Sequence, residues 1–145
     1  MKKNIINALE IINKKLKNKK IKWIIGGSTS LYLQGINIKK TSDIDIATDK
    51  EGAFKINEIF KEHEIKPVKF SKNKIISSYR GKFKIKNIEV DIMGELKKKI
   101  GNKWVNISRR RLKSPKFVEI RNIRIPVTPL EQHLVSYKGL RRKKD

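Results

Sequence analysis

Cysteine is absent from the 145 residues, which excludes disulfides and any zinc site built on thiolates. His63 stands at the end of an expected helix, where a histidine is typically a surface or cap residue, and His133 is similarly isolated, so no histidine metal site is expected. No apolar run reaches membrane-spanning length, and no signal peptide opens the chain. The motif G-x-x-x-x-G-K-S/T is also missing, which argues against a P-loop NTPase. We therefore expect a soluble cytoplasmic protein with one domain over residues 1–145.

Acidic residues are scarce. Lysine and arginine number 37 against 14 acidic residues, which gives a formal net charge of +23. A surface this positive attracts nucleotides, nucleic acids or other polyanions. The chain is also rich in Ile and Asn, so genome composition or a thermophile's preference for lysine explains the same charge without a partner. Both explanations stay open at this point.

One stretch near the N-terminus carries an anion-binding pattern. An apolar run over residues 21–25 predicts a buried strand that ends at Gly26-Gly27. Ser28 offers an N-cap hydroxyl for a short helix over residues 29–34, and Gly35 stands where a C′ glycine belongs. A strand that turns through glycines into a helix leaves backbone N–H groups unpaired and aimed at one point. We expect that point to bind a phosphate.

Two carboxylates follow this turn. Because side chains alternate along a strand, Asp43 and Asp45 point to one face while Ile44 and Ile46 point into the core. Carboxylates ~5 Å apart repel each other by about 3 kcal/mol at an effective dielectric of ~20. This arrangement suits Mg²⁺, which binds one or two carboxylates together with substrate phosphates. A solvated strand end is the alternative explanation.

The ordered set Gly26-Gly27-Ser28, Asp43-Ile44-Asp45 and Val90-Asp91-Ile92-Met93-Gly94 resembles the signature of the polymerase-beta-like nucleotidyltransferase superfamily. The resemblance extends from Ile21 to about Gly94. It implies an α/β (α+β) fold in which a mixed β-sheet is flanked by helices on one side, with a C-terminal β-hairpin and helix. It also implies that Asp91 is the third carboxylate. Strand alternation alone leaves Glu89 as an equal candidate.

The resemblance implies a role for each of these residues. Asp43, Asp45 and Asp91 would bind two Mg²⁺ ions, with Mn²⁺ as an alternative, and Asp91 would help to activate the acceptor. The turn residues Gly26, Gly27, Ser28 and Thr29 would bind the nucleotide phosphates. Lys138, on a helix opened by Thr128-Pro129-Leu130-Glu131, is a further candidate phosphate ligand. The basic stretch after Gly139 is similar to the start of a longer C-terminal region in larger relatives, so a homodimer mate or partner is expected to complete the acceptor site.

The implied reaction transfers a nucleoside monophosphate from an NTP to an acceptor hydroxyl and releases pyrophosphate. ATP is the expected donor because it is abundant, and the acceptor is a protein, an RNA or a small molecule. The first alternative is a basic nucleic-acid-binding protein without catalysis. The second is an antitoxin-like regulatory module on the same fold.

The remaining pattern predicts the other elements. Thr48-Asp49-Lys50-Glu51 has the form of a capping box with Thr48 as N-cap. Two-residue turns at Lys86-Asn87 and Arg121-Asn122 predict β-hairpins, and lysines 97–99 are expected in a loop. Arg109-Arg110-Arg111 ends a predicted strand, where it suits a solvated sheet edge slightly better than a phosphate grip. The expected elements are helices over 2–18, 29–34, 49–63 and 129–138, and strands over 21–25, 43–46, 65–70, 83–85, 88–92, 103–113, 118–120 and 123–125.

Overall fold

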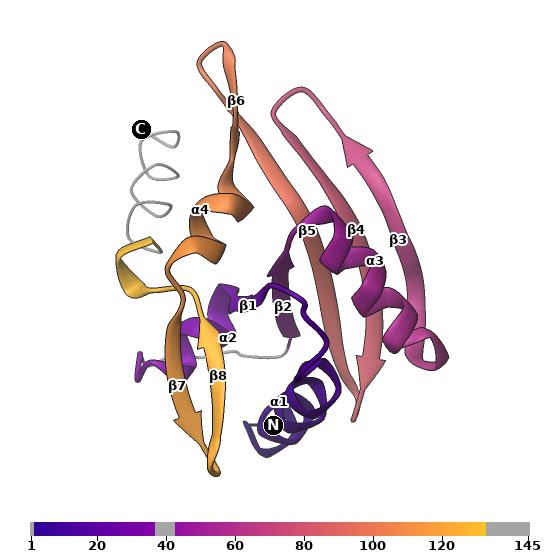
Figure 1. The fold of residues 1–145 in the computed structure, drawn as a ribbon, viewed down its shortest axis with the longest axis vertical. Coiled ribbons are helices and arrows are strands. Elements are labelled where there is room, and N and C mark those ends of the chain that lie inside the picture. Colours follow the sequence, from indigo (N-terminus) through magenta and orange to yellow (C-terminus); the bar gives the residue numbers. More distant parts are fainter. Residues whose placement is uncertain (1, 37–42, 133–145) are drawn as a thin grey trace.

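The computed structural model describes residues 2–36 and 43–132. Figure 1 shows their arrangement, in which helices and strands mix along the whole chain. A 3-10 turn at Lys61–His63 follows α3. The elements in chain order are α1 (Lys2–Leu16), β1 (Trp23–Gly26), α2 (Gly27–Leu33), β2 (Asp43–Thr48), α3 (Lys50–Ile59), β3 (Glu64–Lys72), β4 (Ile76–Ile85), β5 (Ile88–Ile100), β6 (Lys103–Asn106), α4 (Ile107–Lys113), β7 (Lys116–Ile120) and β8 (Ile123–Val127).

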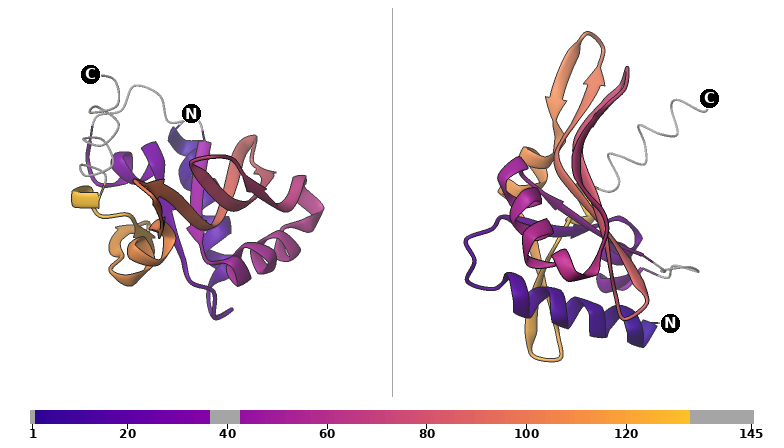
Figure 2. Two further views of the ribbon diagram at one scale, coloured as in Figure 1. Left: turned by 90° about the horizontal axis from the view of Figure 1, so that it is seen from above. Right: turned by 90° about the vertical axis from the view of Figure 1, so that its right-hand side faces the viewer.

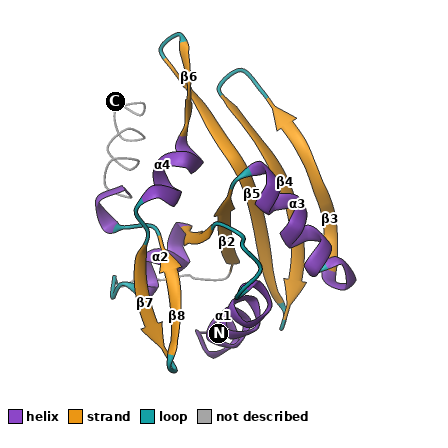
Figure 3. Ribbon diagram, viewed as in Figure 1, coloured by secondary structure: helices purple, strands orange, loops and turns teal. Residues whose placement is uncertain are grey.

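The strands form one mixed sheet in the order β3-β4-β5-β2-β1-β8-β7, and β6 pairs with the far end of β5. β2 runs antiparallel to β1 and parallel to β5, while β1 and β8 are parallel. Figure 3 shows the strands crossing the molecule, with the β5–β6 hairpin extending beyond the helices. The predicted mixed sheet with flanking helices is confirmed.

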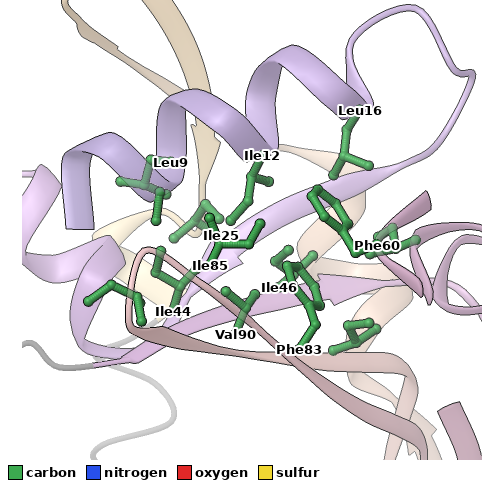
Figure 4. Packing of buried hydrophobic residues seen from close by; sticks show 14 of the residues in the cluster. Leu9, Ile12, Leu16, Ile25, Ile44, Ile46, Phe60, Phe83, Ile85 and Val90 are labelled. Carbon is green, nitrogen blue, oxygen red and sulfur yellow. The ribbon is translucent and has the colours of Figure 1, made fainter. Parts of the chain in front are cut away.

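The hydrophobic core lies between this sheet and the helices α1 and α3. Alternation in β2 buries Ile44 and Ile46 completely, and both belong to the cluster formed with the apolar stripes of α1 and α3. Phe60, just after α3, stacks on Phe83 of β4 with ring centroids 4.3 Å apart (Figure 4). In Figure 2 α3 lies on one side of the long strands, and α1 crosses their lower end. The opposite face of β2 is therefore left for Asp43 and Asp45.

Both predicted hairpins are confirmed, and their strands are longer than expected. Lys86 and Asn87 have φ values of 52° and 62°, and Arg121 and Asn122 have 49° and 67°. Positive φ at both central residues is the type I′ conformation, whose twist matches that of the flanking strands. The lysines at 97–99 were wrongly expected in a loop, because β5 continues to Ile100 and pairs with β6.

Two predicted helix caps are wrong. The α3 N-cap is Asp49, whose carboxylate accepts a hydrogen bond from the Gly52 N–H at 2.6 Å. The hydroxyl of Thr48 instead donates to the carbonyl of Lys22 at 2.6 Å, so this side chain joins β2 to the start of β1. The helix α2 begins two residues earlier than expected, with Gly26 as N-cap and Ser28 inside the helix. Gly35 does follow α2 with a positive φ of 90°, as predicted.

The predicted strand over residues 103–113 is also wrong. Its first part is β6, but the chain then turns into α4, which contains the three arginines. Asn106 caps this helix by accepting a hydrogen bond from the Arg109 N–H at 2.9 Å. Asn is among the strongest N-cap residues, and Arg and Leu are good helix formers. The arginines therefore do not protect a sheet edge.

The C-terminal helix begins at Leu130, and its course beyond Gln132 lies outside the described residues. Thr128 does not use its hydroxyl as a cap, because that group donates to the carbonyl of Ile25 at 3.3 Å. None of the helices in the described residues has the length and hydrophobicity needed to span a membrane.

Candidate active site

Gly26, Asp45 and Asp91 lie next to one another on adjacent strands. Gly26 of β1 pairs with Asp45 of β2, and Asp45 pairs with Asp91 of β5. Residues paired across neighbouring strands project from the same face of a sheet. Asp43, two residues before Asp45, shares that face, and its partner on β5 is Glu89. The structure therefore brings the predicted carboxylates together and puts Asp91, rather than Glu89, directly beside Asp45.

The glycine turn touches these carboxylates. A β carbon on Gly27 would lie 2.2 Å from Oδ2 of Asp45, so only glycine leaves room for this carboxylate. Gly27 also has a φ of 60°, a conformation that glycine adopts without strain. The buried hydroxyl of Thr29 donates to the carbonyl of Asp43 at 2.6 Å. The turn and the start of β2 are thus held together.

Asp45 is the electrostatic centre of the site. Burial raises the pKa of the Asp45 carboxyl, and the neighbouring Asp91 and Asp43 carboxylates raise it further. Arg80 and Arg111 act in the opposite direction and lower the pKa of Asp45. Burial of acidic groups that repel one another opposes folding, so the ionised form of Asp45 is destabilised in the protein alone.

Lys82 of β4 lies beside the carboxylates on β5. It is paired with Asp91 in the sheet, and its Nζ is 3.7 Å from Asp91 Oδ1 and 3.8 Å from Glu89 Oε2. Side-chain exposure is 26% for Lys82 and 32% for Asp91, so this ion pair is only partly screened by water. Lys82 therefore compensates part of the negative charge on the β5 side of Asp45.

Arg111 comes to the site from α4. Burial lowers the pKa of its guanidinium, and the charge of Asp45 opposes this effect. α4 is held against β5 by Ser108, whose buried hydroxyl accepts a hydrogen bond from the Leu96 N–H at 2.8 Å. This contact sets where α4 lies and hence where Arg111 meets Asp45.

The donor set fits a divalent cation. Asp43, Asp45 and Asp91 supply hard oxygen ligands. Burial raises the pKa of Asp45 most, and the charges of Asp91 and Asp43 add to it, so a bound cation would relieve part of this cost. Within residues 2–36 and 43–132, no cluster of three or more acidic or histidine side chains is close enough to hold one ion in the conformation described. Cation binding would require these carboxylates to turn from their present rotamers. Asp91, for example, would exchange its ion pair with Lys82 for a contact with the cation.

The remaining basic residues of the site differ in how far the sequence predicted them. Lys138 lies outside the described residues, so its contact with phosphate stays a prediction. Arg80 and Lys82 were not singled out as site residues, and Arg111 was considered as a phosphate ligand but was assigned to a sheet edge. Counting back from the Lys86-Asn87 turn would have placed Lys82 opposite Asp91. Arg111 offered no such signal, since a packed helix brings it to Asp45.

Comparison with known families agrees with this geometry. The profile of the aminoglycoside-2″-adenylyltransferases matches residues 8–145. The chain belongs to this family. As a member, it is a nucleotidyltransferase, an enzyme that transfers a phosphorus-containing group, and the suspected superfamily is confirmed. None of the proteins with curated functions matches the sequence significantly.

Solved structures resemble this aminoglycoside-2″-adenylyltransferase family member to different degrees. A Thermotoga maritima protein assigned as a nucleotidyltransferase is 36% identical, with a TM-score of 0.92 over 99% of this chain and 89% of its own. The lincosamide antibiotic adenylyltransferase LnuA, bound to lincomycin, has a TM-score of 0.57 at 15% identity and covers 93% and 84%. ANT(2″)-Ia in complex with adenylyl-2″-tobramycin has a TM-score of 0.52 at 11% identity and covers 89% and 70%. At these two identities the likeness concerns the fold alone.

Proposed function

We propose that the enzyme transfers AMP from ATP to a hydroxyl group of an acceptor and releases pyrophosphate. One observation carries this proposal, namely the row of paired residues in which Gly26, Asp45 and Asp91 are neighbours. The row joins a glycine turn suited to phosphate with a set of carboxylates suited to a metal. Transfer of a nucleoside monophosphate in general agrees with the family of the chain.

In the proposed reaction the acceptor oxygen forms a bond to the α-phosphorus of ATP. The bond from that phosphorus to the oxygen bridging to the β-phosphate breaks, and pyrophosphate leaves with the bond electrons. Asp91 accepts the proton of the acceptor hydroxyl, because it borders Asp45 from the side away from the glycine turn. When the ion pair between Lys82 and Asp91 breaks, the Asp91 carboxylate is free to accept this proton.

Asp43 and Asp45, with Asp91, would bind Mg²⁺ or Mn²⁺. When bound, such ions neutralise the triphosphate charge and stabilise the charge that develops at the phosphorus. The backbone N–H groups of Gly27, Ser28 and Thr29 would hold the β- and γ-phosphates. Their position against Asp45 and Asp43 supports this assignment. Arg111 would offset the charge of Asp45 from the α4 side.

The test compares two carboxamide variants on the same sheet face. With ATP labelled at the α-phosphate and Mg²⁺ present, Asp45→Asn should lose transfer and pyrophosphate release by on the order of a hundredfold or more, because metal-bound oxygen stabilises the transition state by several kcal/mol. Glu89→Gln removes the carboxylate that is paired with Asp43 and lies outside the row of Gly26, Asp45 and Asp91. This variant should keep most of the activity. Equal activity of Asp45→Asn and the wild type, or no Mg²⁺-dependent nucleotide binding by the wild type, would refute the proposal.

A further inference from the structure

On the sheet face that carries the carboxylates, the charged side chains change from acidic to basic toward the edge strand β3. Lys66 of β3 pairs with Lys82 of β4, and Lys82 pairs with Asp91 of β5. One row of paired residues therefore runs from Lys66 through Lys82 and Asp91 to Asp45. The neighbouring positions on the same face add Arg80, which pairs with Lys69, and Lys84, which pairs with Glu89.

We name the exposed members of this set the basic face: Lys66, Lys69, Arg80 and Lys84. Lys82 differs from them because it is half-buried and paired with Asp91 and Glu89. Within the part of the chain that the structure describes, no carboxylate lies within ion-pair distance of any member of the basic face. The three lysines are therefore available to an external anion, whereas Arg80 also offsets part of the charge of Asp45.

Protection of the sheet edge explains only half of the basic face. Lys66 and Lys69 lie on β3, the edge strand of the described sheet, where lysine discourages pairing with another sheet. Arg80 and Lys84 lie on β4, which is paired on both sides by β3 and β5. No edge is exposed there, so edge protection does not explain the cations at these positions. Arg80 offsets part of the charge of Asp45, but no such internal role accounts for Lys84.

The position of the basic face relative to the site indicates what binds to it. Neighbouring strands are about 4.8 Å apart, so Lys66 is about 10 Å from Asp91 across the sheet. Asp91 is the carboxylate on the side of Asp45 away from the glycine turn, which is the side that the acceptor occupies in the proposed reaction. An acceptor that reaches Asp91 along the sheet would therefore pass over the basic face.

The chemistry of the basic face selects among acceptors. A cationic amine compound would be repelled by the cations of the basic face, and a small neutral alcohol would not need them. A protein partner usually requires an apolar centre of contact. The exposed aromatic side chains Phe54 and Phe70 instead pack on Tyr79, on the side of the sheet that α3 covers. A strand of phosphodiesters matches repeated cations without an apolar centre.

We propose that the acceptor is a single strand of nucleic acid, whose phosphates bind the basic face and whose terminal 3′-hydroxyl is presented at Asp91. This inference rests on the proposed function, because the hydroxyl is the nucleophile of that reaction. The new bond joins the terminal 3′-oxygen to the α-phosphorus of ATP, pyrophosphate leaves, and Asp91 receives the proton. The strand becomes longer by one nucleotide.

Binding can be tested separately from transfer. The probe is a short fluorescent single-stranded RNA with a free 3′-hydroxyl, and its affinity is measured by anisotropy at several salt concentrations. Lys66→Gln with Lys69→Gln should weaken binding about tenfold and reduce the slope of log affinity against log salt by about 1.4, the value for two lost single-strand contacts. Lys14→Gln with Lys15→Gln removes the same charge from exposed positions of α1 on the helix side, and it should leave affinity nearly unchanged. Equal weakening by both pairs would overturn the inference.

Transfer is tested with ATP labelled at the α-phosphate, Mg²⁺ and the same RNA, alongside a protein mixture and an aminoglycoside as competing acceptors. Label in the RNA, absent when the 3′ end of the RNA has been oxidised with periodate before the reaction, supports the inference. Label in the protein or the aminoglycoside but not in the RNA overturns the inference and leaves the proposed function standing. Absence of Mg²⁺-dependent ATP binding by the wild type would overturn both.

Discussion

Gly27 and Asp45 are in direct contact across the start of α2, although β1 and β2 are separated by that helix in the chain. A β carbon at position 27 would lie 2.2 Å from Oδ2 of Asp45 and 3.2 Å from its Cγ. Real side chains do not approach this closely, so the carboxylate and a larger residue cannot both keep their places. The glycine therefore sets the conformation of the central carboxylate as well as that of the turn.

This contact predicts that Gly27→Ala displaces Asp45 and inactivates the enzyme. The variant should also lose stability, because a side chain at a φ of 60° costs about 1–2 kcal/mol before the contact with Asp45 is added. Gly101→Ala is the matched control, since Gly101 has a φ of 65° and nothing within 4 Å of its added β carbon. Urea unfolding and AMP transfer are measured on both variants. Similar behaviour of the two would contradict a role for the Gly27–Asp45 contact.

Asp45→Asn should stabilise the protein when no divalent cation is present. Because the pKa of Asp45 is raised in the folded state by burial and by Asp91 and Asp43, the protonated form favours folding. That contribution is complete below the unfolded pKa of about 3.9 and is lost as the pH rises through the folded pKa. At neutral pH the charged carboxylate lowers the free energy of unfolding, and its removal should raise it by about 0.5–2 kcal/mol.

The pH series is measured by thermal melts in EDTA. The gain from Asp45→Asn should shrink as the pH falls into the acid range, where the wild-type carboxyl is protonated. Asp43→Asn changes an exposed carboxylate on the same strand and should have a smaller effect. A destabilised Asp45→Asn protein at neutral pH would contradict the electrostatic account.

Mg²⁺ should raise the melting temperature of the wild type. A ligand that binds only the folded state adds about 2.7 kcal/mol of stability at a concentration one hundred times its dissociation constant. The rise should be absent from Asp45→Asn and present in Glu89→Gln, and it should be reversed by EDTA. An equal rise in all three proteins would show that the ions bind elsewhere.

Ser108→Ala should weaken both folding and transfer. The change leaves the buried N–H of Leu96 without its acceptor, which costs about 1–3 kcal/mol. It also loosens α4 from β5, so Arg111 is held less firmly beside Asp45 and transfer falls. Ser114→Ala, at the exposed C-cap of the same helix, should change neither quantity. Loss of stability with full activity would show that α4 does not position Arg111.

The parts of the fold that depend on short-range contacts were predictable from the sequence. A hairpin with a two-residue turn fixes its own pairing, so Lys86-Asn87 and Arg121-Asn122 were correctly assigned from the alternation on either side. Local competition was harder to judge. Thr48 and Asp49 are both good caps, and Thr48 instead donates its hydrogen bond to Lys22, the residue before β1. The arginines after Asn106 were misassigned because charge alone does not distinguish a helix from an edge strand.

The sequence by itself determined the chemical character of the site. Alternation puts Asp43 and Asp45 on one face of β2, and the glycines before α2 allow a tight turn, since both properties depend only on neighbouring residues. Tertiary structure decided which groups surround Asp45. Parallel pairing of β2 with β5 put Asp91 beside it, and packing of α4 added Arg111. These contacts join distant segments whose relative positions depend on which faces are buried, and no local pattern encodes that choice.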